Sequence, residues 1–234
     1  IDTYNYMSRK IQQLMDDQAK AAENLRIAEF DSLQAQINPH FLYNTMDMIS
    51  WLAQQGKSDE VTEVVRRLSR FYRLTLSRKQ ELTTIADEAE HVTIYIELQN
   101  MRFNNGIDFI MDIPDYLMEY SMPKLIFQPL VENSIIHGIM EKEEKTGSIV
   151  LTGWMEDEDI VLLLSDDGVG IDPDILPKFL DGTFHNPQSK GSNVAVYNTH
   201  RRLQILYGER YGLSFSSTKG QGTEVQIRIP AILP

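Results

Sequence analysis

The first part of the chain carries apolar residues at helical spacing. From Tyr4 to Ala28, the positions that would face a partner helix stand alternately three and four residues apart, which is the spacing of a coiled coil. A single helix of this kind requires a partner helix. A second stripe, from Leu33 to Trp51, passes through Pro39. Proline removes a helical hydrogen bond and bends the axis. The pattern therefore predicts a coiled coil followed by a bent helix.

A short turn separates this bent helix from the next one. Gly56 to Asp59 are turn-forming residues, and apolar residues return at helical spacing from Val61 to Leu76. Two such helices form a hairpin, and an apolar face too wide for one neighbour favours a four-helix bundle of two chains. A further helix is expected over Ile85 to Arg102, with Thr84 as its cap and Asp87 three residues later.

After Asn104-Asn105-Gly106 the pattern changes to short apolar strands mixed with helices, which predicts an α/β domain. Further helices are expected over 123–139 and 194–206, and residues 172–192, with three prolines and no periodicity, predict a long loop. The expected strands, two of them joined by the acidic turn 156–159, are 107–113, 149–154, 160–164, 213–217 and 224–229. The fold class is therefore α+β, with a helical hairpin before a mixed domain.

The composition excludes several classes of function. The 234 residues include 22 Lys and Arg against 34 Asp and Glu, a formal charge of −12, which argues against a nucleic-acid partner. The absence of cysteine excludes disulfides, thiol nucleophiles and Cys-ligated metals. No apolar run is long enough to span a membrane, and no secretion signal is present. Because the chain begins at Ile1, we expect it to be a fragment of a longer protein.

Two glycine-containing segments are candidates for ligand contact. Asp166-Asp167-Gly168-Val169-Gly170 follows an apolar strand, and Gly220-Gln221-Gly222-Thr223 precedes the last one. Glycine lets the backbone approach a ligand closely, and backbone amides with a hydroxyl suit a phosphate. Taken alone, each segment is more often an ordinary turn than a nucleotide site.

Two further segments carry polar groups on predicted helices. Asn133 and His137 stand four residues apart, hence on one face of a helix, where an amide oxygen suits Mg²⁺ and a histidine suits phosphate. Taken singly, each is more often a polar surface residue. His40 lies at the margin of an apolar stripe beside Phe41 and can face water. A lone histidine in such a place is usually structural or merely exposed.

Taken together and in order, four segments resemble the LytS/YesM-type sensor histidine kinases over about residues 25 to 230. The segments are Pro39-His40-Phe41-Leu42-Tyr43-Asn44, Gln128-Pro129-Leu130-Val131-Glu132-Asn133 with His137-Gly138, Asp166-Asp167-Gly168-Val169-Gly170, and Gly220-Gln221-Gly222-Thr223. The resemblance implies a dimeric helical hairpin followed by a Bergerat-type ATP-binding domain, an α/β sandwich. It also implies three parts: the end of a HAMP module and its signalling coiled coil over 1–30, dimerisation and phospho-acceptor helices over 31–105, and the catalytic domain over 106–234.

The resemblance also implies roles for particular residues. His40 would accept the phosphoryl group from Mg-ATP and pass it to an aspartate of a response regulator, Asn133 would bind the Mg²⁺, and Asp166 would accept a hydrogen bond from the adenine amine. The other expected ATP-binding residues are His137, Gly168, Gly170, Asn198, Gly220, Gly222 and Thr223. The chain would be a homodimer and the cytoplasmic part of a cell-membrane protein, attached through N-terminal segments that this sequence lacks.

Departures from the family pattern keep two alternatives open. Ser192-Asn193-Val194-Ala195-Val196 stands where the family has Ser-Gly-x-Gly-Leu, and Ile136 stands where a basic residue is common. A non-catalytic dimeric scaffold with a degenerate nucleotide site is therefore one alternative. The other is an ATP hydrolase of the same fold, which would need a glutamate four residues before Asn133, where this chain has Pro129. No general base for His40 can be named, and Asn38 and Asn44 are expected to orient its ring.

Overall fold

A computed structural model gives the fold. It describes residues 39–76, 82–103, 105–172, 174–176, 180 and 192–234, together with Gln12, Met15, Gln18 and Lys20, which are helical. Most of the expected coiled coil and of the loop over 172–192 lies outside the described residues. The chain forms two compact units, one ending at Gly56 and the other running from Lys57 to Pro234.

In the first unit, helix α2 (Pro39–Gln54) corresponds to the second half of the bent helix expected from the sequence. The buried apolar side chains are Phe41 and Leu52. Trp51, expected on the apolar stripe, is instead 55% exposed, because the neighbouring Leu52 occupies the buried side of the helix. Gly56, at a φ of 72°, follows the helix in a left-handed turn.

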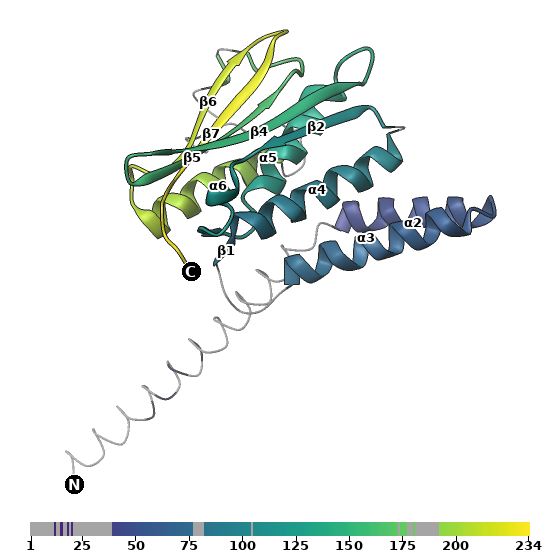
Figure 1. The fold of residues 1–234 in the computed structure, drawn as a ribbon, viewed down its shortest axis with the longest axis horizontal. Helices are drawn as coiled ribbons and strands as arrows, with labels where there is room; N and C mark the ends of the chain where they lie inside the picture. The colour runs from purple at the N-terminus through teal and green to yellow at the C-terminus, as the bar shows by residue number, and fades with distance from the viewer. Residues whose placement is uncertain are drawn as a thin grey trace. The chain divides into compact units, whose positions relative to one another are not determined.

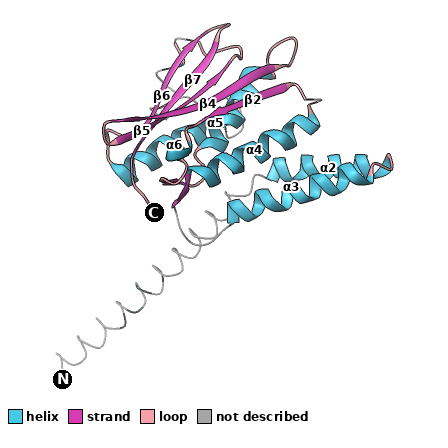
Figure 2. Cartoon of the chain, in the orientation of Figure 1, coloured by secondary structure: helices cyan, strands magenta, loops and turns pink. Residues whose placement is uncertain are grey.

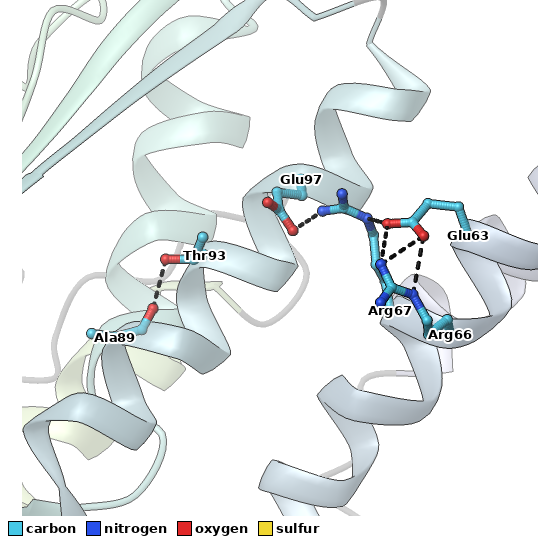
Figure 3. Close-up of polar contacts among 6 residues, drawn as sticks. All are labelled: Glu63, Arg66, Arg67, Ala89, Thr93 and Glu97. Atoms are coloured by element: carbon cyan, nitrogen blue, oxygen red, sulfur yellow. Dashed lines mark hydrogen bonds and ion pairs between the residues drawn. The ribbon is translucent and has the colours of Figure 1, made fainter. Parts of the chain in front are cut away.

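The second unit begins with two helices that pack side by side, α3 (Ser58–Leu76) and α4 (Ile85–Arg102). Helix α3 starts at Ser58, so the turn expected over 56–59 is shorter than predicted. The Phe71 ring stacks on the His91 ring with centroids 4.3 Å apart. Beside this apolar contact, Arg67 of α3 binds Glu97 of α4, as Figure 3 shows. The same arginine also pairs with Glu63, one turn back in α3.

The start of α4 confirms the capping prediction. The Thr84 hydroxyl accepts a hydrogen bond from the Asp87 backbone N–H at 3.1 Å, and the helix runs from Ile85 to Arg102 as expected. Most of its side chains are buried, because one side packs on α3 while the others meet β2 and α5. The helix is therefore a shared layer between α3 and the sheet domain.

The sheet has five strands in the order β2-β4-β5-β7-β6. The pairing of β2 with β4 is parallel, and the other three pairings are antiparallel. The expected β4–β5 hairpin is confirmed, with Glu156 opposite Asp159. The strands are β2 (Ile107–Asp112), β4 (Gly147–Glu156), β5 (Asp159–Asp166), β6 (Gly212–Thr218) and β7 (Gly222–Pro230).

Helices α4, α5 (Phe127–Asn133) and α6 (Ser192–Tyr207) cover one face of this sheet, as Figures 1 and 2 show. Alternate strand residues such as Leu151, Leu162 and Ile227 are fully buried, which builds the core between the two layers. A helical part followed by a mixed α/β domain confirms the predicted α+β class. Dimerisation of the hairpin stays a prediction.

The helix expected over 123–139 ends at Ile139 as predicted but starts later, and its second half is a π-helix. Pro123 ends a short strand, β3 (Ser121–Pro123), which pairs with β1 (Leu82–Thr84), and a 3₁₀ turn (Asp115–Leu117) precedes it. Leu125 has a φ of 57°, which no α-helix allows, so α5 begins only at Phe127. After Asn133 the helix widens into a π-helix over Ser134–Ile139.

Candidate functional site

Asp166, the last residue of the central strand β5, is the centre of the site. Its Oδ2 accepts a hydrogen bond from the Ser134 hydroxyl at 2.6 Å, and its Oδ1 accepts one from the Gly168 backbone N–H at 3.0 Å. Burial raises the pKa of this carboxyl, and the bonds from Ser134, Gly168 and the Thr223 backbone oppose that rise. The carboxylate is therefore an acceptor held in one orientation at the end of the sheet.

Two glycines let the turn after β5 lie directly on the π-helix. A methyl group at Gly168 would overlap the backbone of Gly138, and one at Gly138 would come within 3.1 Å of Asp166 Oδ1. The Val169 N–H donates to the Gly138 carbonyl at 3.2 Å, which fastens the turn to the helix. Single π turns inside helices are frequent at functional sites. Here the widened turn carries the residue that binds Asp166.

The second glycine segment lies against the backbone of the same aspartate. Gly222 opens β7 with a φ of 101°, and a methyl group there would overlap the carbonyl oxygen of Asp166. Gly220 donates its N–H to the Val169 carbonyl at 2.7 Å, so the two glycine segments are bonded to each other. Thr223 stands opposite Asp166 in the β5–β7 register. The sequence placed Gly222 and Thr223 before the strand, whereas they are its first residues.

The Thr223 hydroxyl belongs to a small network with Ser217. The two hydroxyl oxygens lie 3.0 Å apart, and Ser217 Oγ also donates to the Gly222 carbonyl at 2.7 Å. The same oxygen accepts a hydrogen bond from the Ile171 N–H at 2.8 Å. Ser217 therefore ties the end of the Asp166–Gly170 segment to β6 and β7, a role that the sequence analysis did not assign.

The neighbouring carboxylate, Asp167, makes different contacts. Its Oδ1 accepts a hydrogen bond from the Ser148 N–H at 2.9 Å, and its Oδ2 lies 3.4 Å from Lys142 Nζ. These contacts attach the turn to the start of β4. Of the two aspartates, Asp166 is therefore the one that is held beside the glycine segments.

Asn133 and His137 lie on the helix beside this turn. Asn133 is the last residue of α5 and is 8% exposed, whereas His137 is half-buried in the π-helix. Burial lowers the pKa of His137, and Glu141 acts in the opposite direction. Both residues lie on the continuous helical run from α5 into the π-helix, and the expectation that their side chains share one face stays a prediction.

The expected role of Asn198 at the site stays a prediction. This residue is exposed on α6, and no hydrogen bond among the described residues joins it to Asp166 or Thr223. Gly170 has a φ of 70° and lies against the Thr218 carbonyl, within the bonded glycine segments. The structure thus brings together all the expected glycines with Asp166 and Thr223.

His40 is exposed on α2, as the sequence predicted. The Asn44 amide nitrogen lies 3.1 Å from His40 Nδ1, one helical turn away, which orients the ring as expected from the sequence. Asn38, the other residue expected to orient it, lies outside the described residues. A neutral imidazole that faces water is a competent nucleophile.

Glu88 of α4 is a buried group that the sequence analysis missed. Its carboxylate accepts hydrogen bonds from the N–H groups of Leu125 at 2.7 Å and Ile126 at 3.0 Å, immediately before α5. Burial raises its pKa, while these backbone bonds and Arg202 lower it. Arg202 of α6 in turn binds the Lys124 carbonyl. Glu88 thereby fixes the start of the helix whose other end carries Asn133.

A sequence signal for Glu88 existed. With Ile85 and Ala89 it falls on the apolar stripe of the predicted helix, where a charged residue requires a buried partner. Ser134 offered a weaker signal, since it only adjoins Asn133. His200 has a structural role, because its Nδ1 accepts a hydrogen bond from the Leu213 N–H at 2.9 Å.

The oxygen-bearing side chains of the site suit a magnesium ion that binds together with a nucleotide. The described residues contain no group of three or more His, Asp or Glu side chains placed to hold a metal. Mg²⁺ bound with a nucleotide commonly takes one or two protein oxygens and otherwise water and phosphates, and the Asn133 amide oxygen would be one such ligand. Asp166 lines neither of two surface cavities in the described part. One, of about 470 Å³, lies between α3 and α4, and the other, of about 450 Å³, lies beside Asp167.

Family models match most of the chain. Residues 28–107 match the model described as "Histidine kinase", and residues 120–232 match "Histidine kinase-, DNA gyrase B-, and HSP90-like ATPase". Among solved structures, the catalytic domain of histidine kinase ThkA superposes with a TM-score of 0.52 at 16% identity, over 65% of this chain and 99% of that one. The sheet domain therefore has the fold of a histidine kinase ATPase domain.

Curated relatives identify the family. The sensor histidine kinase YesM of Bacillus subtilis is 31% identical over 97% of this chain and 37% of its own length. The sensor protein LytS of Oceanobacillus iheyensis is 34% identical over 90% of this chain and 36% of its own length. The chain belongs to the sensor histidine kinases of the LytS/YesM type, and it spans little more than a third of these relatives.

Within the described ranges, no helix is both long enough and apolar enough to cross a bilayer.

Proposed function

We propose that this chain is the catalytic part of an ATP-dependent protein-histidine kinase. The observation that carries the proposal is the Asp166 carboxylate, fixed by Ser134 and Gly168 between two bonded glycine segments at the end of the central strand. Such an acceptor suits the amine of an adenine base, and glycine backbone suits the approach of a nucleotide. Membership of the LytS/YesM family supports the same assignment.

In this proposal some of the remaining site residues contact the adenine base and the others lie near the phosphates. Thr223, Gly220 and Gly222 close the base pocket, and Gly168 and Gly170 let the chain wrap the nucleotide. Asn133 holds the Mg²⁺ that neutralises phosphate charge when bound, and His137 lies near the phosphates. Asn198, which is exposed on α6, would contact the edge of the bound nucleotide.

His40 is the proposed acceptor of the phosphoryl group. A neutral ring nitrogen attacks the γ-phosphorus of ATP, so a P–N bond forms while the P–O bond to the β-phosphate breaks and its electron pair leaves with ADP. The ring proton goes to solvent. The exposure of His40 and its contact with Asn44 support this role, because the acceptor must be reachable and oriented. The phosphoryl group then passes to an aspartate carboxylate of a response regulator.

The organisation of the longer protein is also proposed. Residues 1–30 would transmit a signal, 31–105 would dimerise and carry the acceptor, and 106–234 would bind ATP; a break between the matched family models at 107 and 120 supports the second boundary. The chain would act as a homodimer and lie on the cytoplasmic side, attached to the membrane by N-terminal segments.

The proposal is tested by incubating the chain with Mg²⁺ and γ-labelled ATP, beside a His40→Gln variant. Acid-labile, base-stable label is expected in the unchanged chain and absent from His40→Gln, while both bind ATP equally. Label that persists in His40→Gln would contradict the acceptor assignment. Absence of ATP binding would favour the degenerate scaffold. Phosphate release without label would favour the hydrolase, which Pro129 in the first turn of α5 argues against.

A further inference from the structure

Ser134 makes an unusual hydrogen bond for a hydroxyl on a helix. It is 3% exposed, and its Oγ donates to Asp166 Oδ2 at 2.6 Å, across 32 residues of sequence. A serine or threonine in a helix ordinarily bonds the carbonyl four residues earlier. Thr93 does so with Ala89 at 2.7 Å, as Figure 3 shows, and Thr199 does so with Ala195. Ser134 gives up this local bond for one with the carboxylate.

The bond determines how much of the carboxylate is left for a ligand. An ionised carboxylate has about four acceptor positions. On Asp166 they meet Ser134, the Gly168 N–H and the Thr223 backbone, which together leave room for about one further donor. The rotation of the carboxyl about its bond to the chain is fixed by donors on three different elements: the π-helix, the turn after β5, and β7.

We infer that Ser134 is a positioning residue for base recognition: it holds the Asp166 carboxylate so that its remaining acceptor position takes the 6-amino group of a purine. This inference rests on the proposed nucleotide function and deepens it. A purine that lacks the amine leaves the same acceptor unpaired, and a buried unpaired acceptor costs affinity. Selection for adenine would therefore depend on Ser134 as well as on Asp166.

The charges around Asp166 are consistent with this role. Burial is the main effect that raises the pKa of Asp166, and the charge of Asp167 adds to it. Lys142 lies beside Asp167, and the Ser134 bond is the largest of the effects that lower the pKa of Asp166. Ser134 thus favours the ionised carboxylate, which is the form that only accepts hydrogen bonds.

The test compares two nucleotides on Ser134→Ala and on the unchanged chain. The affinity for ATP and for purine riboside triphosphate, which lacks the 6-amino group, is measured by calorimetry for both. We expect Ser134→Ala to bind ATP about five- to tenfold more weakly, the size of one typical hydrogen bond, and the analogue less than about twofold more weakly. A merely structural role would weaken both ligands alike.

Two variants serve as controls. Thr93→Val also removes one hydroxyl, but from a helix-internal bond on α4, and should leave both affinities unchanged. Ser134→Thr keeps a hydroxyl and should keep the preference for ATP. Equal losses for the two nucleotides in Ser134→Ala, or no loss for either, would overturn the inference while the proposed function stands. An unchanged chain that binds neither nucleotide would overturn both.

Discussion

The turn around Asp166 and the contact between α3 and α4 belong to one compact unit, yet different forces hold them. The turn is held by backbone: glycines lie against carbonyl groups, and short hydrogen bonds join segments distant in sequence. The helix contact is held by side chains, with the Phe71 ring on His91 and ion pairs at its margin. Side chains can adjust to a substitution in small steps, whereas closely spaced backbone cannot.

The largest effect is expected in the turn. A Gly222→Ala methyl group would overlap the Asp166 carbonyl at a φ that disfavours side chains, so we expect a loss of about 4 kcal/mol in the free energy of unfolding. Urea denaturation of the purified chain measures it. Gly208→Ala is the matched control, because Gly208 has nearly the same φ, 102°, with no atom near its missing Cβ.

For Gly208→Ala the expected loss is only about 1 kcal/mol, the cost of the backbone conformation alone. If the two variants lost equal stability, the steric account of the Asp166 turn would be wrong. The contrast between rigid backbone and adjustable side chains would then have no basis.

An intermediate effect, visible as pH dependence, is expected at His91. Burial lowers the pKa of His91 to about 4, and its Nδ1 has no hydrogen-bond partner in the described part of the chain. The unfolded chain, with a histidine pKa of about 6.5, therefore takes up the proton first. Stability from His91 is complete above pH 6.5 and is lost as the pH falls toward 4, by up to about 3 kcal/mol.

His91→Phe keeps a ring beside Phe71 and removes the titration. The difference in unfolding free energy between the unchanged chain and His91→Phe should change by about 3 kcal/mol between pH 7 and pH 4. Taking the difference matters, because burial raises the pKa of Glu88 and Asp166 and these groups act in the opposite direction. A difference independent of pH would show that His91 is accessible to protons in the folded chain.

The smallest effect is expected at the margin of the helix contact. Arg70 binds Glu90 through two hydrogen bonds of 2.7 and 2.6 Å, with both side chains more than 40% exposed. Exposed ion pairs stabilise little and are screened by salt. A double-mutant cycle with Arg70→Gln and Glu90→Gln should give a weak favourable coupling that disappears at roughly 1 M salt. Coupling that persists at high salt would place this pair among the buried contacts.

Local sequence patterns predicted much of this fold. The helix over Ile85–Arg102 with its Thr84 cap and the β4–β5 hairpin follow from rules that act within a few residues. The same rules misplaced the start of α5, because they foresaw neither the positive φ of Leu125 nor the hydrogen bond from its N–H to Glu88. They also missed the π-helix after Asn133, where Gly138 meets Gly168.

The sequence by itself determined which elements form and, through four ordered segments, which family the chain belongs to. Only the tertiary structure decided which buried polar groups meet: Glu88 with the N–H of Leu125, 37 residues away, and Ser134 with Asp166, 32 residues away. Periodicity shows which face of a helix is apolar. It does not show which acceptor a buried donor will reach, because that pairing is fixed only when the layers pack and water is excluded.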